Sequence, residues 1–244
     1  MGYAPLVGFG AFVLASLVVG TRLLATGLRT RELPELAIGT AFLTGGGLGY
    51  LLVVMALVLR VFPPTLGPLA LHAGVFLIYL GTAATTCGVW RIFRPGERWA
   101  AALCAAISCV LAVAFALRLL SSVDDAASPI HFWPSTLAGA ASYAWSAFET
   151  LRYHALLRRR VRLGLAEPAM ARRFLLWGCG SVAAVGIHAI SMLNRFVDPA
   201  AIGALMLALQ SMLGLAAALA IWLAFFPPAW FERQMRPRSA RAKA

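Results

Sequence analysis

The chain has 244 residues, of which 61% are hydrophobic and only 12% are charged, and its mean hydropathy is +0.82. These values exclude an ordinary soluble domain and indicate a membrane protein. The net charge of +12 would suggest nucleic-acid binding in a soluble protein, but here the charges lie between long apolar runs, so no nucleic-acid partner is expected.

Seven uncharged runs are each long enough to cross the ~30 Å hydrocarbon core of a bilayer as a helix. None alternates polar and apolar residues as a membrane strand would. We therefore predict an all-α fold, a seven-transmembrane helix bundle over residues 1–230 with a basic cytoplasmic tail over residues 231–244. In chain order the runs are Met1–Thr21, Leu36–Leu59, Val61–Trp90, Trp99–Leu117, Ala126–Phe148, Phe174–Asn194 and Pro199–Phe231.

Basic residues are distributed unevenly between the two ends of this predicted bundle. Eighteen of the 21 lysines and arginines fall on the face that holds the first, third and fifth connections and the C-terminus. Only Arg60, Arg118 and Arg195 fall on the other face. The positive-inside rule then places the N-terminus outside and the C-terminus in the cytoplasm. Because arginine far outnumbers lysine and alanine is abundant, as in GC-rich bacterial genomes, the expected location is a bacterial inner membrane, with multiple passes.

The fifth connection is the most basic segment within the chain. We interpret its arginines chiefly as topology anchors that contact anionic lipid headgroups. Two alternatives stay open: the segment docks a cytoplasmic signalling protein, or its guanidinium groups form a specific lipid or phosphate site. A homo-oligomer is also compatible with the sequence. The arginines concerned are Arg158, Arg159, Arg160, Arg162, Arg172 and Arg173.

Small residues inside the runs indicate helix packing. Gly45 and Gly49 have the spacing that allows two membrane helices to approach closely. Gly178, Gly180 and Gly186 in the sixth run would admit either a neighbouring backbone or a ligand ring. The four cysteines all fall within runs and are expected to pack as small hydrophobic residues.

Polar residues inside membrane helices are the best pointers to a ligand site, because burying them without a partner is expensive. His72 and His188 lie on different predicted helices at similar depth in the outer half. We predict an outer pocket lined by His72, Tyr79, Arg118, His188 and Asn194, with Arg118 also paired to Asp124 or Asp125. No metal site is expected; the alternative is that His72 and His188 hold a haem.

Glu149 is the one acid inside a predicted helix, and Arg152 and Tyr153 follow it. We interpret it as a local i,i+3 or i,i+4 partner that secures the helix end. A pH switch through His154 is the alternative.

Enzyme chemistry finds little support in the sequence. The four histidines form no HxxxH or HExxH motif, and the only lysine is Lys243, in the tail. No carboxylate lies in the middle of a run, where coupled transport would need one. These features favour a protein that is not an enzyme.

The layout resembles uncharacterised bacterial seven-helix inner-membrane proteins and the seven-helix input modules of sensor kinases. The segments that carry the resemblance are RTRELPELAIGTAFLTGGGLGY after the first run, the basic fifth connection and AFFPPAWFERQ at the end of the seventh. Input modules feed a fused output domain, and this chain ends shortly after its last run, so signalling would need a separate partner.

Two kinds of function are consistent with these features. The first is a receptor or sensor that binds a small apolar or amphipathic ligand and signals through its basic cytoplasmic face. The second is a haem- or cofactor-binding redox subunit that uses His72 and His188. Facilitated transport, or an accessory role in a larger membrane complex, completes the alternatives.

Overall fold

The computed structural model of the chain describes residues 4–57, 59–120, 128–197, 199–228 and 231. All regular structure over these residues is helical, which confirms the all-α prediction. Because α2, η1 and α3 follow one another without a break, the described chain forms seven helical rods. The helices are α1 (Ala4–Thr30), α2 (Leu33–Thr40), the π-helix η1 (Ala41–Gly49), α3 (Tyr50–Leu57), α4 (Gly67–Phe93), α5 (Arg98–Leu120), α6 (Pro129–Arg162), α7 (Pro168–Leu193) and α8 (Pro199–Phe225).

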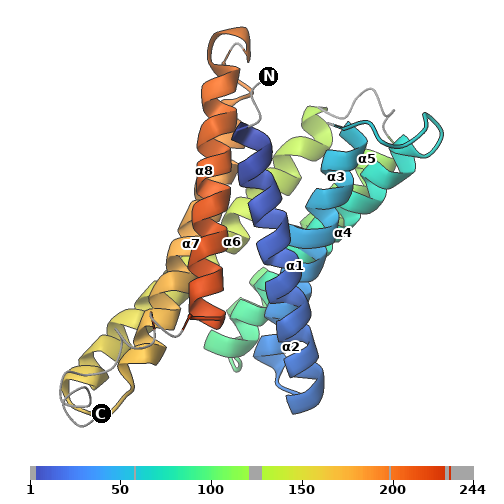
Figure 1. The fold of residues 1–244 in the computed structure, drawn as a ribbon. Coiled ribbons are helices and arrows are strands. Elements are labelled where there is room, and N and C mark those ends of the chain that lie inside the picture. The colour runs from blue at the N-terminus through green and yellow to red at the C-terminus, as the bar shows by residue number, and fades with distance from the viewer. Residues whose placement is uncertain (1–3, 58, 121–127, 198, 229–230, 232–244) are drawn as a thin grey trace.

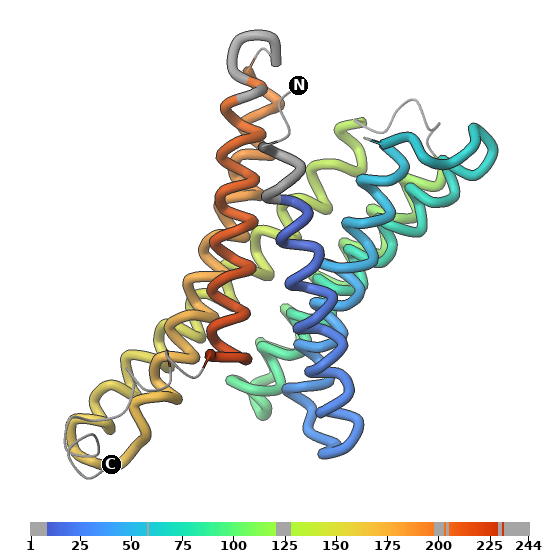
Figure 2. The backbone as a smooth tube through the Cα atoms, in the orientation of Figure 1, coloured from blue at the N-terminus to red at the C-terminus, as the bar shows by residue number. Residues whose placement is uncertain are grey.

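Successive rods run in opposite directions, so the connections alternate between the two ends of the bundle (Figure 1). The turns between α1 and α2, α4 and α5, and α6 and α7 lie at one end, together with the last turn of α8. We call this the basic end, because it holds most of the arginines of the described chain. At this end the hairpin of α6 and α7 extends past the end of α8 (Figure 2).

Six of the rods form a closed ring. α1 packs against the α2–η1–α3 rod on one side and against α8 on the other. α8 then packs on α7, α7 on α6, α6 on α4, and α4 on η1 and α3, which closes the ring. α5 lies outside it, against α4 and α6.

Prolines and one glycine set several of the helix boundaries. Pro34, Pro68, Pro129 and Pro168 occupy the first turns of α2, α4, α6 and α7, where the missing N–H costs no hydrogen bond. At the end of α6, Gly164 adopts a φ of +72°, and the Leu165 N–H donates to the Arg160 carbonyl over 2.9 Å. This is a Schellman ending, which closes α6 before the turn into α7.

The second rod contains a nine-residue π-helix, η1, in which four glycines are buried. A Cβ at Gly45 would lie 3.3 Å from the Gly81 Cα of α4, and one at Gly81 would lie 2.6 Å from the Gly45 backbone. A Cβ at Gly49 would lie 2.9 Å from the Gly74 carbonyl oxygen. The close helix approach predicted for Gly45 and Gly49 is therefore confirmed, with α4 as the partner.

Six of the rods are long and apolar enough to cross a membrane, judged by length and composition. They are α1, the α2–η1–α3 rod, α4, α5, α7 and α8. α6 is the exception because it carries many polar residues, although it is the longest helix of the described chain, with 34 residues.

The polar residues of α6 face its neighbours in the bundle. Ser142 lies 2.7 Å from the Thr86 hydroxyl of α4, and Ser146 lies 2.9 Å from the Ser181 hydroxyl of α7. All four side chains are buried. The low apolarity of α6 thus reflects its place between α4, α5 and α7, where hydroxyl groups bond across helices.

The arginines of the predicted fifth connection lie largely on helix. α6 continues to Arg162, past the predicted end of its run at Phe148, so part of the basic segment forms the last turns of α6. The rest lies in the first turns of α7, and all six arginines named for this surface are exposed. The predicted tail, residues 231–244, lies outside the described residues apart from Phe231.

Candidate functional site

A cavity of about 110 Å³ lies inside the ring of six rods. Every rod of the ring contributes to its wall, whereas α5, described over its full length, contributes nothing. We call it the central cavity. Most of its wall is apolar, and its polar groups come from Tyr50, Thr82, Thr85, Tyr143, Ser181 and His188.

His188 of α7 is held in the wall of the central cavity by two neighbours on α6. Its imidazole stacks on the Tyr143 ring, with centroids 5.7 Å apart and an interplanar angle of 30°. A Cβ at Gly139 would lie 2.5 Å from the His188 Cε1 atom, so only glycine leaves room for the ring at this place. Gly139 and Tyr143 are four residues apart and therefore share a face of α6.

The other polar groups of the cavity are positioned by neighbouring helices. The Tyr143 hydroxyl lies beside Thr82 and Thr85 of α4. Tyr50, at the start of α3, packs edge-on against Phe12 of α1, with ring centroids 5.7 Å apart. Aromatic rings thus surround a space with a few hydroxyl groups and one imidazole, a mainly apolar lining with a few polar groups that resembles small-molecule sites in chemistry but encloses a smaller volume.

In the part of the chain that the structure describes, the lining of the central cavity includes neither a carboxylate nor a cysteine. Among the described residues, no group of three or more histidine, cysteine, aspartate or glutamate side chains could hold a metal ion. What the cavity offers is hydrogen bonding at Tyr143 and His188 and apolar contact elsewhere.

The residues predicted for an outer pocket do not converge. Of the five, only His188 lines the central cavity. His72 hydrogen-bonds through Nδ1 to the Pro68 carbonyl, one turn earlier in α4, over 2.7 Å. Asn194 is exposed at the C-cap of α7. The sequence could not show which face of each helix turns inward, and the similar depth predicted for His72 and His188 is wrong, because His188 lies at the level of Tyr143 and Thr82, far along α4 from His72.

His72 and His188 are too far apart to ligate one haem. His188 stacks on Tyr143, which lies beside Thr82, and Thr82 is ten residues along α4 from His72. At ~1.5 Å per residue this separation is about 15 Å along the helix, whereas two axial ligands must reach the same iron atom. The residues named for a haem therefore do not fit one.

Tyr79 and Arg118 belong to a second polar group, between α4, α5 and α6. Arg118 Nη1 donates to Nε2 of the buried His131 over 3.2 Å. Tyr79 lies beside Ser135 and packs against Phe115, with ring centroids 6.3 Å apart. His131 was not predicted as a partner of Arg118; the predicted partners, Asp124 and Asp125, lie outside the described residues.

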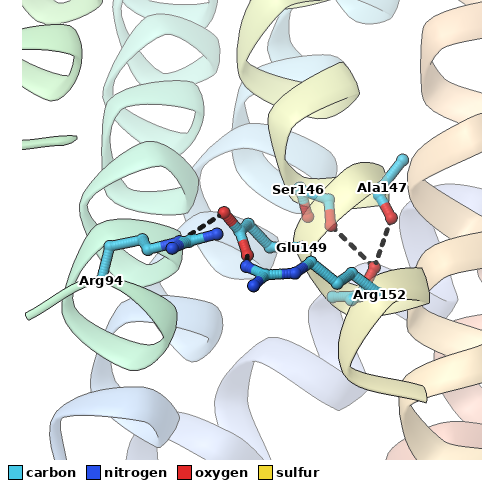
Figure 3. Close-up of polar contacts among 6 residues, drawn as sticks. Arg94, Ser146, Ala147, Glu149 and Arg152 are labelled. Carbon is cyan, nitrogen blue, oxygen red and sulfur yellow. Dashed lines mark hydrogen bonds and ion pairs between the residues drawn. The ribbon is translucent and has the colours of Figure 1, made fainter. Parts of the chain in front are cut away.

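Glu149 is the centre of a charged group at the basic end (Figure 3). Its carboxylate is 4% exposed and accepts a 2.7 Å hydrogen bond from Arg94 Nε, just after the end of α4. Arg152 Nη1 lies 3.6 Å from the other carboxylate oxygen. The predicted i,i+3 pair exists, but the shorter contact is to Arg94, and that hydrogen bond raises the pKa of the Arg94 guanidinium.

Several residues that line the central cavity were not predicted from the sequence. Tyr50, Thr82 and Tyr143 were missed as cavity residues, because each sits in an apolar run with no motif around it. The spacing of Gly139 and Tyr143, with small residues between them, is a sequence feature that could have indicated the cavity. A glycine four residues before an aromatic residue leaves space on one helix face. Of the three glycines singled out in α7, Gly180 lines the cavity, and Gly178 and Gly186 face leucine side chains.

Comparison with known protein families, characterised proteins and solved structures finds no match to this chain.

Proposed function

We propose that the chain is a receptor-like protein of a bacterial inner membrane that binds a small, mainly apolar ligand and signals to a separate partner. The ligand would occupy the central cavity, with its polar end at His188 and Tyr143. The observation that carries this proposal is a cavity walled by all six rods of the ring, since a molecule bound there contacts each of them. Ligand binding would thus bias how the rods pack.

The π-helix supports this assignment. Ala41, Phe42, Gly45 and Gly46 of η1 line the cavity. π-Helical turns are rare and occur frequently at functional sites.

The basic end supplies a candidate output surface. The six arginines named for this surface, Arg158 to Arg173, are exposed and have no ion pair among the described residues. The α6–α7 hairpin that carries them extends past the end of α8 (Figure 2). We propose that they contact anionic headgroups and a cytoplasmic signalling protein. We also propose that α6 crosses the membrane as the seventh span and that the basic end faces the cytoplasm.

The ligand proposal is tested by what purifies with the protein. Ala184 lines the cavity, so Ala184→Trp fills it, whereas Ala189→Trp adds the same ring at an exposed position of the same helix. Mass spectrometry of extracts should find a small molecule with the wild type and Ala189→Trp that is missing with Ala184→Trp and reduced with His188→Ala. Equal recovery from all four proteins would contradict the proposal.

Orientation has an independent test. A green fluorescent protein fused after Ala244 should fluoresce, and alkaline phosphatase fused there should be inactive. An active phosphatase would place the basic end outside and remove the proposed output surface.

Facilitated transport is a second candidate, because two cavities lie in series. Trp177 lines the central cavity, and Phe174 lines a second pocket at the basic end. Their rings stack with centroids 6.1 Å apart at 22°, so one layer of rings separates the two spaces. If this layer is a gate, Trp177→Ala should accelerate release of the co-purifying molecule from proteoliposomes loaded with it; an unchanged rate would exclude this function.

A further inference from the structure

A second pocket, of about 320 Å³, lies at the basic end between α4, α6 and α7. We call it the basic-end pocket. It is lined by the charged group of Arg94, Glu149 and Arg152 and by the aromatic rings of Phe93, Tyr153 and Phe174. It does not share a lining residue with the central cavity.

The charged group has one more positive charge than negative. Glu149 is buried and balances one guanidinium, Arg94, through the 2.7 Å hydrogen bond. Arg152 is 49% exposed and lies at 3.6 Å, beyond hydrogen-bond distance. The lining therefore carries a net charge of one positive unit, from two arginines and one glutamate, while Glu97, outside the lining, also acts electrostatically on Arg94.

Guanidinium donors are also in surplus. Each arginine has about five N–H donors. Within the described chain, Arg94 uses only Nε in a hydrogen bond, and Arg152 makes none. The Arg94 guanidinium also lies over the Trp99 ring, 5.6 Å from its centroid, which fixes its direction. Donors from two elements of one pocket, with Arg94 held in place, suit an anion with several acceptor oxygens, such as a phosphate group.

The rest of the wall is apolar. Ile92 and Leu156 complete the lining, and Phe93, Tyr153 and Phe174 form a continuous aromatic cluster with ring centroids 4.7 to 5.8 Å apart. Free phosphate gains nothing from such a wall, whereas an amphiphile would bury its apolar part there.

We propose that the basic-end pocket binds a single anionic phosphate group carried on an amphiphile, with Arg152 and the free edge of Arg94 as its donors. The ligand class is that of an anionic phospholipid headgroup. Glu149 has two effects on the site. Its carboxylate holds Arg94 in place, and its negative charge limits the ligand to a single negative charge. This site is independent of the ligand proposed for the central cavity.

The test uses the full chain in detergent and measures fluorescence polarisation of a tail-labelled phosphatidylglycerol. Arg152→Gln leaves the hydrogen bond between Arg94 and Glu149 intact and should weaken binding about tenfold, the effect of one charged hydrogen bond. Glu149→Gln keeps the shape of the side chain and an oxygen that accepts from Arg94 Nε, removes the negative charge and should tighten binding severalfold. Arg29→Gln, the same change at an exposed position of α1, should have little effect.

Two probes distinguish the source of the phosphate. Tail-labelled phosphatidylcholine has no net charge. It should bind at least about tenfold more weakly than phosphatidylglycerol if binding depends on the negative charge of the headgroup. Inorganic phosphate that displaces the labelled lipid at low millimolar concentration would point to a soluble phosphate ester, and failure to displace it would point to the lipid. The proposal is overturned if Arg152→Gln and Arg29→Gln weaken binding equally, or if Glu149→Gln weakens it, since either result means general attraction to a basic surface.

Discussion

The central cavity and the basic-end pocket bury polar groups in two different ways. In the cavity the polar groups are hydroxyls and one imidazole, supported by neighbouring hydroxyls, aromatic rings and a glycine that makes room. In the pocket a carboxylate is buried against two guanidiniums. Burying a neutral polar group costs a few kcal/mol at most, while an unpaired charge costs far more. The two sites should therefore respond very differently when one partner is removed.

The largest effect is expected from Arg94→Gln. It leaves Glu149 buried without its hydrogen-bonded partner and should lower the unfolding free energy by about 3 kcal/mol. Arg152→Gln should cost less than about 1 kcal/mol, because this arginine is half exposed and farther away. Thermal unfolding in detergent measures both. Arg94→Gln combined with Glu149→Gln should recover most of the loss; if it does not, the ion pair is not what Arg94 contributes.

A smaller effect is expected from Gly139→Ala in the central cavity. The new methyl group would fall 2.5 Å from the His188 ring, which must move, at a cost of about 1–3 kcal/mol. Retention of the co-purifying molecule should fall as well. Gly214→Ala is the matched control, since the nearest atom to its Cβ position lies 4.0 Å away. Equal behaviour of the two variants would mean that His188 is not held by α6.

Ser142→Ala should have a smaller effect still. It removes a buried hydrogen bond to Thr86 of 2.7 Å, which in membrane bundles is worth about 0.6 to 1 kcal/mol. A double-mutant cycle with Thr86→Ala measures the coupling. Thr26→Ala, whose exposed hydroxyl bonds only within α1, should change stability less. A coupling free energy of zero would mean that the hydrogen bond between Ser142 and Thr86 does not stabilise the contact between α4 and α6.

The smallest effect concerns pH. The hydrogen bond that Arg94 donates to Glu149 raises the pKa of Arg94 above its ordinary value, so the stability from this charge is complete below that value and is lost only as pH rises through the raised pKa. Between about pH 7 and pH 10 the contribution of Arg94 should therefore be constant. The difference in unfolding temperature between wild type and Arg94→Gln measures it. A difference that shrinks across this range would contradict the assignment.

The sequence predicts the helical rods and the distribution of arginines because both depend on local composition. Apolar runs give the rods, and breaks at proline and glycine give their ends, as at Gly164. The close approach at Gly45 and Gly49 is also predictable, because small residues in an apolar helix have few other uses. The π-helix is not, since the run around it is as apolar as an α-helical one.

The sequence alone could not predict which residues contact each other across different helices. Glu149 and Arg94 are separated by 55 residues, and spacing along one helix favoured Arg152. His188 packs against Gly139 and Tyr143, and Arg118 hydrogen-bonds to His131. Predicting these contacts requires knowing how each helix is rotated about its axis. Of the five residues predicted for an outer pocket, His188 lines the central cavity and the other four lie outside its lining.

The most direct test of the account is a density map of the full chain purified in mild detergent from its native membrane. The account predicts density not explained by protein inside the central cavity, in contact with His188 and Tyr143, and its absence from a map of Ala184→Trp. A wild-type map in which side chains close the cavity, or in which foreign density occurs only at the basic end, would contradict it.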